Sequence, residues 1–446
     1  MATRTVGIDL GIRGPHVATM VDGEGYPIGV PLRFRLVAAE LRQLVQQVRH
    51  GLAADDQVVV VLEPTGMAWL PLARWLVRAG CTVIRVKGQR VKALRRYLSE
   101  HAKTDLRDAE LLGQIPRFGA QGLRPLYVPS AAQHALNRLT KQRLRYQEEM
   151  CSIRRRLLDL IRWAQPALER ALPDLQTTVA LAVLEQYFDP QRLHRLGPRR
   201  LEGFLREHVG GNHPGHGPFI EALAHRLLEA AEATLALHGP DDVDFGRLQL
   251  EVDQEITLLR MHRTHMVALE REIEPLYTAL HTPAVLRTLP GIGNTLGPSL
   301  FAVLHTWQRF GSQRRLRGFC GLFPTRNESG GVDRPGQSIT QGGHNRLKRD
   351  LILAAEVART VDPELAAVYY RCMVEKGHHH RQALCAVATR LINRLHAVWK
   401  SGRPYVLRDL QGQPLTVPEA KALIAATLRV PDVVRRTRRR NLAPAA

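Results

Sequence analysis

Four acidic residues occur where their carboxylates could act together on a phosphate ester. Asp9 lies within a short apolar strand, and Glu63 directly follows a second, strongly β-branched one. Asp105 and Asp108 are three residues apart, which places both on one face of a helix that begins at Asp105. A charge among buried apolar residues is costly unless it is paired or bound to a metal, so Asp9 in particular calls for a partner.

Carboxylates that lie close together repel one another, and divalent cations relieve that repulsion. Hard, oxygen-rich sites select magnesium, with manganese as an alternative. Two such ions can bridge a phosphate, activate the attacking oxygen and stabilise the leaving oxygen. We therefore expect the four acids to bind Mg²⁺. Taken singly, each has an ordinary explanation: Asp105 and Asp108 suit the first turn of a helix, and Glu63 suits a solvated strand end.

A candidate nucleophile, Ser329, lies in the C-terminal part of the chain. It is followed by two glycines in a polar stretch that we expect to be a flexible loop, where the hydroxyl could reach a phosphorus atom. An unaided serine is a poor nucleophile and needs a base or a metal. A Ser-Gly pair is common in linkers, so the pattern alone is weak, and Ser338 is a nearby competitor.

Two further patterns near this serine indicate contact with DNA. The run Leu-Pro-Gly-Ile-Gly contains Gly291 and Gly293 and is typical of a helix-hairpin-helix. Its glycines let backbone N–H groups approach a phosphate, and the following helix N-terminus adds partial positive charge. The turn could instead be a simple packing corner. Arg346, Lys348 and Arg349 precede an apolar helix and form a basic cluster suited to a DNA backbone.

The charge balance also favours a polyanionic partner. The 446 residues include 63 Lys and Arg against 42 acidic residues, which gives a formal net charge of +21. Nucleic acid is the natural partner, bound through phosphate contacts and counterion release. Incidental adhesion to membranes or ribosomes is the alternative. The basic run at residues 435–440 is expected to be solvated.

Cysteine usage and hydropathy exclude several classes of protein. The five cysteines are scattered without a CxxC pair, which argues against a disulfide framework and against a zinc finger. The sequence predicts no signal peptide, and it contains no run of about 18 apolar residues. We expect a cytoplasmic protein that acts on the nucleoid.

The elements that must position the acids form an α/β domain. The expected order is three strands, then helix, strand, helix, strand and helix, which is the order of the ribonuclease-H-like fold, a mixed sheet covered by helices. Adjacent strand ends converge at one edge of such a sheet, so Asp9 and Glu63 can approach each other. The expected strands are residues 3–12, 15–19, 28–36, 57–62 and 81–87, and the expected helices are residues 37–52, 67–79 and 89–98.

Two long helices are expected in the middle of the chain. Residues 130–168 carry a heptad seam with one polar interruption at Arg143, and residues 248–280 have a similar, less regular register. Such helices should pair in a coiled-coil-like way, within one chain or between chains, unless each packs on a local core. The seam consists of Leu136, Leu139, Arg143, Tyr146, Met150, Ile153, Leu157 and Leu160.

These patterns divide the chain into four parts. Residues 1–125 form the metal-dependent domain, and residues 126–281 form a helical linker and oligomerisation region with an insertion near 169–247. Residues 282–400 form a mostly helical domain that carries the glycine turn and Ser329. Residues 401–446 form a basic tail.

Together, these pieces resemble the DEDD insertion-sequence transposases, the IS110 family of bridge-RNA-guided recombinases. The resemblance covers roughly residues 4–165 and 283–370. Each piece is weak alone, but their order and spacing are specific. The matching pieces are GIDLG with Asp9, LEPTG with Glu63, KTDLRDAELL with Asp105 and Asp108, LPGIG, FCGLFP, ESGG with Ser329, and GHNRLKRDL.

The resemblance implies a mechanism and a set of partners. The N-terminal domain would be similar to the RuvC type of ribonuclease-H fold, found in Holliday-junction resolvases, with its four acids as magnesium ligands. Ser329 of the transposase domain would attack DNA and become covalently joined to it, activated when the two domains meet across DNA. Members act as oligomers, so a dimer or tetramer is expected. A structured bridge RNA would pair with donor and target DNA.

Two other functions stay open at this point. A stand-alone endonuclease of the Holliday-junction type would need the four acids but not Ser329. A non-catalytic nucleic-acid-binding protein that has kept the fold would need only the basic surface. Covalent trapping on DNA separates the recombinase from the endonuclease.

Overall fold

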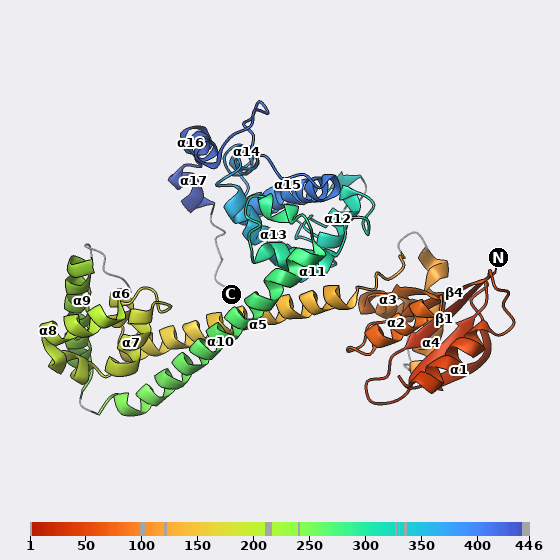
Figure 1. Ribbon diagram of the computed structural model, residues 1–446, viewed down its shortest axis with the longest axis horizontal. Helices are drawn as coiled ribbons and strands as arrows, with labels where there is room; N and C mark the ends of the chain where they lie inside the picture. Colours follow the sequence, from red (N-terminus) through yellow and green to blue (C-terminus); the bar gives the residue numbers. More distant parts are fainter. Residues whose placement is uncertain are drawn as a thin grey trace. The chain divides into compact units, whose positions relative to one another are not determined.

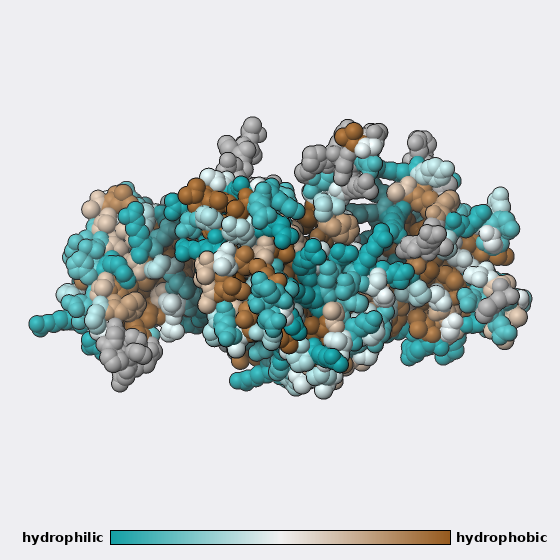
Figure 2. Space-filling view, turned by 90° about the horizontal axis from the view of Figure 1, so that it is seen from above, coloured by the Kyte–Doolittle hydropathy of each residue, from teal (hydrophilic) through white to brown (hydrophobic). Residues whose placement is uncertain are grey.

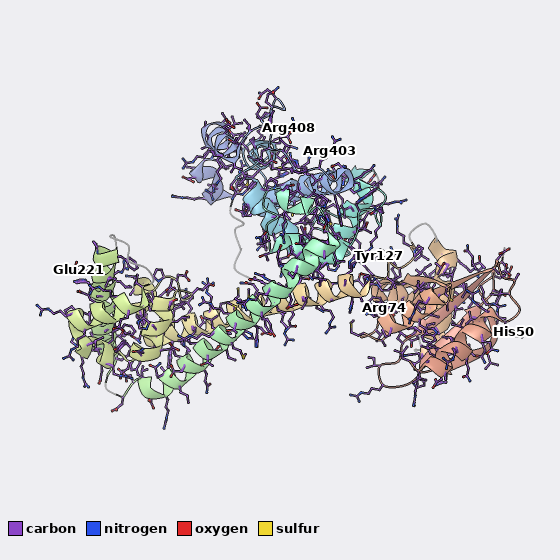
Figure 3. All side chains as sticks on the ribbon, in the orientation of Figure 1. His50, Arg74, Tyr127, Glu221, Arg403 and Arg408 are labelled. Atoms are coloured by element: carbon purple, nitrogen blue, oxygen red, sulfur yellow. The ribbon has the colours of Figure 1, made fainter. Side chains whose placement is uncertain are left out.

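The computed structural model describes residues 2–98, 104–119, 123–209, 216–239, 241–325, 328–329, 331–333 and 337–438. The chain divides into two compact units, Met1–Ser130 and Ala131–Ala446. The last residues of the first unit are fastened to it. Leu126 donates its backbone N–H to the carbonyl of Val83 (2.6 Å), and Arg74, labelled in Figure 3, donates to the carbonyl of Pro129 (3.4 Å).

The first unit is a five-stranded mixed sheet with helices, as the sequence predicts (Figure 1). The strand order is β3-β2-β1-β4-β5, with β1 antiparallel to β2 and parallel to β4. One expectation is wrong: β1 ends at Asp9 rather than at Ile12, so Asp9 terminates the strand. The elements are β1 (Thr3–Asp9), β2 (His16–Val21), β3 (Pro27–Phe34), α1 (Ala38–Arg49), β4 (Gln57–Leu62), α2 (Trp69–Arg78), β5 (Thr82–Arg85), α3 (Gly88–Leu98) and α4 (Asp105–Gly119).

The two faces of this sheet bury different side chains. Val6 and Ile8 of β1 pack with residues of α1 and α2, and Val61 of β4 packs with residues of α3 and α4. This separation follows from the β-strand period of two, which sends neighbouring side chains to opposite faces. Odd-numbered residues of β1, Asp9 among them, therefore face α4.

Gly7 lets α4 lie directly on β1. A Cβ atom at residue 7 would lie 1.9 Å from the carbonyl oxygen of Ala109 and 2.3 Å from the backbone nitrogen of Gly113. No side chain fits between the two backbones. Gly7 and Asp9 share one face of β1, and Asp105 is one turn before Ala109 on the same face of α4. The close contact at Gly7 thus carries α4 over the strand end that bears Asp9.

The second unit contains two long helices that pack against each other, α5 (Ala131–Ala164) and α10 (Phe245–Leu280) (Figure 1). The polar interruption at Arg143 is accommodated by Glu270, whose carboxylate lies 2.6 Å from the guanidinium. Arg156 and Glu255 form a second ion pair between the same helices (2.6 Å). The long helices therefore pair within one chain, and association between chains stays a prediction.

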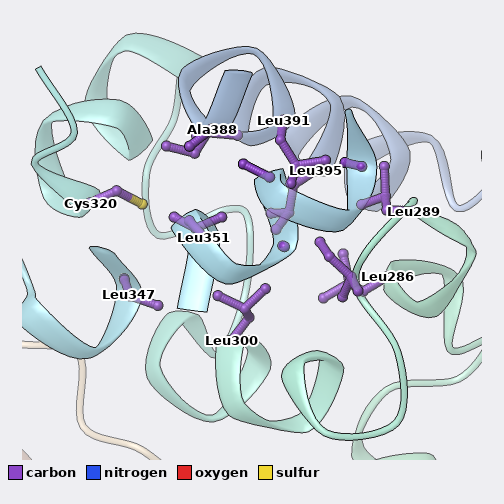
Figure 4. Close-up of a cluster of buried hydrophobic side chains, with 14 of the residues drawn as sticks. Leu286, Leu289, Leu300, Cys320, Leu347, Leu351, Ala388, Leu391 and Leu395 are labelled. Carbon is purple, nitrogen blue, oxygen red and sulfur yellow. The ribbon is translucent and has the colours of Figure 1, made fainter. Parts of the chain in front are cut away.

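Two hydrophobic cores lie in this unit. Among the described residues, one core contains parts of α5 and α10 with α6 to α9, and the other contains further residues of α5 and α10 with the 3₁₀ turn η2 and α11 to α15 (Figure 4). The elements are α6 (Leu168–Ala171), α7 (Thr178–Tyr187), α8 (Pro190–His208), α9 (His216–Leu237), the 3₁₀ turn η2 (Val285–Thr288), α11 (Leu296–Leu304), α12 (Gln313–Cys320), β6 (Glu328–Ser329), β7 (Val332–Asp333), α13 (Asn345–Ala358), α14 (Pro363–Tyr370), the π-helical η3 (Arg371–Glu375), α15 (His380–Ser401), α16 (Val417–Thr427) and α17 (Asp432–Thr437).

The surface and the cysteines can be described briefly. On the face seen in Figure 2, hydrophobic patches alternate with hydrophilic ones. All five cysteines are free. Within the part of the chain that the structure describes, no helix is both long and apolar enough to cross a membrane.

Gly7→Ala is expected to destabilise the first unit by at least about 2 kcal/mol, because the added methyl group would overlap the backbone of α4. Thermal unfolding followed by circular dichroism should show an earlier transition. Gly23→Ala is the matched control, since nothing lies within 4 Å of a Cβ at that position. Equal melting temperatures for both variants would contradict the close contact between β1 and α4.

Candidate active site

Two of the four acids, Asp9 and Glu63, lie next to each other where β1 and β4 end. Ile8 of β1 pairs with Leu62 of β4 in parallel register, and the next residues along the two strands are Asp9 and Glu63. Val61 packs beneath α3 and α4, so Glu63, two residues later, lies on the same face as Asp9. The sheet therefore brings both carboxylates to one edge, below the same pair of helices.

The other two acids come from the first turn of α4. The helix begins at Asp105, as the sequence predicts, and the Thr104 hydroxyl caps it by accepting a hydrogen bond from the backbone N–H of Arg107 (3.2 Å). Asp105 is exposed and Asp108 is buried. The buried carboxylate is paired with Arg95 of α3, whose Nη2 and Nε lie 2.6 and 2.8 Å from Asp108 Oδ1.

The carboxyl group of Asp9 carries the electrostatic signature of the cluster. Burial, and then the negative charges of Asp108, Asp105 and Glu63, raise the pKa of Asp9 to about 6. Only a backbone hydrogen bond at Leu10 acts in the opposite direction. The three other acids are thus near enough to disfavour a charge on Asp9, and a cation there would relieve that repulsion.

The donor chemistry of this cluster fits a hard divalent cation, because all four side chains offer carboxylate oxygens. In the described part of the chain, however, no three potential ligand side chains are grouped closely enough to hold one ion. Arg95 supplies the positive charge next to Asp108 instead. The structure therefore gathers the acids at one edge of the sheet with an arginine as the counter-charge of one of them.

Two residues of α3 that sequence reasoning missed belong to this site. Arg95 is one of several basic residues in its helix, and nothing in the sequence distinguishes it. Gly88 begins the helix, and a Cβ atom there would lie 2.4 Å from Glu63 Oε1. The Glu63 carboxylate thus lies against the N-terminus of α3, where the helix dipole favours an anion.

Ser329 lies in the second unit, in a short β-hairpin rather than in the flexible loop expected from the sequence. β6 pairs antiparallel with β7, and Ser329 is opposite Val332. The expectation of a loop is wrong because residues of the polar stretch pair with one another through their backbones. The side chain of Ser329 and residue 330 lie outside the described residues, so the nucleophilic role stays a prediction.

The chain segments on both sides of this hairpin are also paired. Thr325 donates its backbone N–H to the carbonyl of Ser338 (2.9 Å), and Thr340 donates to the carbonyl of Phe323 (3.1 Å). These bonds join the segment before Ser329 to the segment after it. Ser338, the alternative nucleophile, takes part in this pairing through its own backbone.

The glycine turn has a packing function in the second unit. Gly291 has a φ of +77°, and a Cβ atom there would lie 2.2 Å from the carbonyl oxygen of Ala354 in α13. Gly293 is exposed, with nothing within 4 Å of such an atom. A single 3₁₀ turn, η2, precedes the glycines where the sequence suggested a helix. A helix-hairpin-helix that contacts DNA through Gly293 stays a prediction.

Arg346, the first member of the basic cluster at the start of α13, is engaged inside the second unit. Only 9% of its side chain is exposed. Its Nε donates to the Ser299 hydroxyl (3.0 Å) and its Nη1 to Asn137 Oδ1 (3.2 Å). Burial lowers the pKa of Arg346 to about 10, while the neighbouring charge of Asp350 acts in the opposite direction.

The other two cations of the cluster also have internal partners. Lys348 donates to the carbonyl of Thr340. Arg349 Nη2 lies 2.6 Å from Asp350 Oδ1, and its Nη1 lies 3.4 Å from Glu148. These contacts give the cluster a structural role, and its role in DNA binding stays a prediction.

Comparison with known proteins points to one group. A family model described as "Transposase" matches residues 6–166, and one described as "Transposase IS116/IS110/IS902 family" matches residues 284–370. The chain is 28% identical over 365 residues to the insertion element IS110 uncharacterized 43.6 kDa protein of Streptomyces coelicolor, covering 80% of this chain and 85% of the relative.

Two further relatives match a similar share of the chain. The insertion element IS116 uncharacterized 44.8 kDa protein of Streptomyces clavuligerus is 25% identical, over 89% of this chain and 95% of its own length. The pilin gene-inverting protein of Moraxella bovis is 22% identical, over 78% of this chain and 81% of its own length.

Arg95→Met is expected to lower the stability of the first unit by about 1–3 kcal/mol in the presence of EDTA, because Asp108 would stay buried without its partner. Added Mg²⁺ should raise the melting temperature of this variant more than that of the wild type, since the ion would replace the lost positive charge. Arg96→Met, in the same helix but exposed, is the control. An equal response of both variants to EDTA and Mg²⁺ would rule out Arg95 as the counter-charge.

Proposed function

The chain belongs to the IS110 family of insertion-element transposases, and on this premise we propose that it cleaves and rejoins DNA with the four carboxylates of its first unit and Ser329 of its second. The observation that carries the proposal is the placement of the acids: Asp9 and Glu63 follow paired residues of β1 and β4, and the close contact at Gly7 holds the first turn of α4 over that strand end. The raised pKa of the half-buried Asp9 agrees with this placement. Such a cluster suits phosphodiester chemistry with divalent ions.

Asp9, Glu63, Asp105 and Asp108 are the proposed ligands of magnesium, or of manganese. When bound, the ion would neutralise these carboxylates and polarise the scissile phosphate. Arg95 would then release Asp108. In the absence of the ion, the same arginine keeps the charge of the buried Asp108 compensated, which allows the acids to stay gathered.

Ser329 is the proposed nucleophile. Its hydroxyl would give up its proton as the oxygen bonds to phosphorus, while the bond from phosphorus to one deoxyribose oxygen breaks. The departing oxygen would take up one proton, so that no net proton is gained or lost. The serine–phosphate ester conserves the energy of the broken phosphodiester, so the strand can be rejoined without ATP. Hydrolysis would discard that energy, which is why a recombinase gains from a protein nucleophile and a nuclease does not.

The proposed partners follow from the family and the charge. The name of the Moraxella bovis relative describes inversion of a gene, a rearrangement in which DNA ends are rejoined. We propose that this chain likewise joins donor and target DNA, as an oligomer and with a structured guide RNA. The excess of 21 positive charges supports binding to both kinds of nucleic acid.

Wild-type protein incubated with labelled donor and target DNA and Mg²⁺ should form a covalent adduct that survives denaturing electrophoresis. Ser329→Ala should form none, and peptide mapping should find the adduct on the peptide that contains Ser329. Ser338→Ala is the matched control and should keep the adduct. Asp9→Asn should lower the rate of adduct formation by about a thousandfold or more, because one carboxylate of the cluster is lost.

The outcomes separate the competing functions. Strand cleavage without any adduct would favour the stand-alone endonuclease that uses only the four carboxylates. DNA binding with neither cleavage nor adduct would favour the non-catalytic alternative. An adduct that survives in Ser329→Ala but disappears in Ser338→Ala would move the nucleophile to the other serine.

Affinity for DNA should fall steeply with salt, because cations that bind phosphates release condensed counterions. A plot of the logarithm of the association constant against the logarithm of the salt concentration should have a slope steeper than about −3, as expected for several phosphate contacts. Fluorescence anisotropy of a labelled duplex gives this plot directly. A flat line would show that the net charge of +21 does not serve phosphate binding.

A further inference from the structure

A cavity of about 350 Å³ lies in the second unit, bounded by α12, the segment that follows it and α15. Its volume falls in the range of about 300–1,000 Å³ that is usual for small-ligand sites. None of the proposed catalytic residues lines it. The residues that bear on its function are Arg314, Arg317, Leu322, Phe323, Thr389 and Ile392.

The apolar part of this cavity offers an aromatic ring to solvent. Leu322 and Ile392 are buried, whereas Phe323 is 43% exposed. The Thr389 hydroxyl lies 3.1 Å from the carbonyl oxygen of Leu322 and ties this segment to α15. An exposed aromatic ring beside a fixed apolar wall is the kind of platform on which nucleic-acid-binding proteins stack single bases.

The charged part of the cavity consists of two arginines on α12. Arg314 and Arg317 are three residues apart, so they lie on the same side of the helix. Among the residues that the structure describes, neither guanidinium has an ion pair or a hydrogen-bond partner. They differ in this from Arg346 and Arg349, which are engaged internally. Two unpaired guanidinium groups next to an aromatic ring suit a phosphodiester and its base.

The cavity adjoins the segment that leads to the proposed nucleophile. The carbonyl of Phe323 accepts a hydrogen bond from Thr340 (3.1 Å), and Pro324 forms a bridge with Ile339. These contacts belong to the paired segments on either side of the hairpin that carries Ser329. A strand that reaches this hairpin therefore passes near a site able to hold one of its nucleotides.

We propose that this cavity binds one unstacked nucleotide of the DNA strand on which Ser329 acts, with the base against Phe323 and a flanking phosphate at Arg314 and Arg317. The inference rests on the proposed function, because it requires a DNA strand at the Ser329 hairpin. A base inside a duplex is stacked on both sides, so it must leave the stack to occupy the cavity. Holding it there fixes the position of the neighbouring phosphates.

The base contact is tested with the full-length protein and labelled single strands, one of oligo-dT and one of the same length without bases. Phe323→Ala should bind oligo-dT about tenfold more weakly than the wild type, because base–aromatic stacking is lost. Its affinity for the abasic strand should be unchanged. Phe219→Ala in α9, where the ring is 50% exposed, is the matched control and should bind both strands normally. Equal weakening toward both strands, or none, would overturn the proposal.

The phosphate contact is tested by salt dependence. Arg317→Gln should make the negative slope of the salt plot less steep by about one, because one phosphate contact is lost, and Arg314→Gln should have the same effect. Arg192→Gln, an exposed arginine of α8, is the matched control and should leave the slope unchanged. Circular dichroism melting confirms that each variant is folded. An unchanged slope for both α12 variants would also overturn the proposal. In the base test, so would a loss of affinity in Phe323→Ala that is seen with oligo-U but not with oligo-dT.

Failure of the inference is distinguishable from failure of the proposed function. If Ser329→Ala abolishes the adduct but Phe323→Ala shows no base-dependent loss, the cavity assignment alone is wrong. If no adduct forms in the wild type but the base-dependent loss is present, the site binds DNA and the chemistry assigned to Ser329 is wrong. The two measurements use different substrates and different readouts, so neither result depends on the other.

Discussion

The backbone of α4 rests on β1 at Gly7, with no side chain between them. This contact holds the first turn of α4 over the strand end, and from it follow the electrostatics of the first unit. Asp105 and Asp108 come near Asp9 because the helix cannot move away from the strand without opening that contact. Burial, and then the charges of the three neighbouring acids, raise the pKa of Asp9, and Arg95 of α3 compensates the charge of the buried Asp108. The fold thus tolerates repulsion between the carboxylates, and the resulting site suits cations.

The second unit uses its positive charge in two different ways. Some arginines are structural: Arg346 bonds to residues of α5 and α11, and Arg349 pairs with the fully buried Asp350. Others, such as Arg314 and Arg317, line a cavity and lack partners among the described residues. A net charge cannot distinguish these uses, because it counts a buried cation and an exposed one equally. The partners of each guanidinium decide which positive charges a phosphate can reach.

Local patterns in the sequence predict much of the first unit, and contacts between distant segments explain what they miss. The order of strands and helices follows from hydrophobic periodicity, and Thr104 caps α4 because capping depends only on the next few residues. The role of Arg95 was not predictable from the sequence, since its pairing with Asp108 depends on how α3 lies beside α4. The pairing of Ser329 with Val332 and the exposure of Phe323 beside α15 likewise depend on tertiary structure. The four acids were predictable as a group because strand ends and one helix face position them.

The division of the chain into two compact units determines when the proposed chemistry can occur. The four acids belong to residues 1–130, and the serine belongs to the remainder. On the proposed function, neither unit holds a complete set of reacting groups, so a strand is cut only when both units engage the same phosphate. Such an arrangement would work as a coincidence detector: a protein that diffuses along the chromosome would leave it intact at every site that satisfies only one unit. Protection of the host genome would then come from the separation itself, without a dedicated inhibitor.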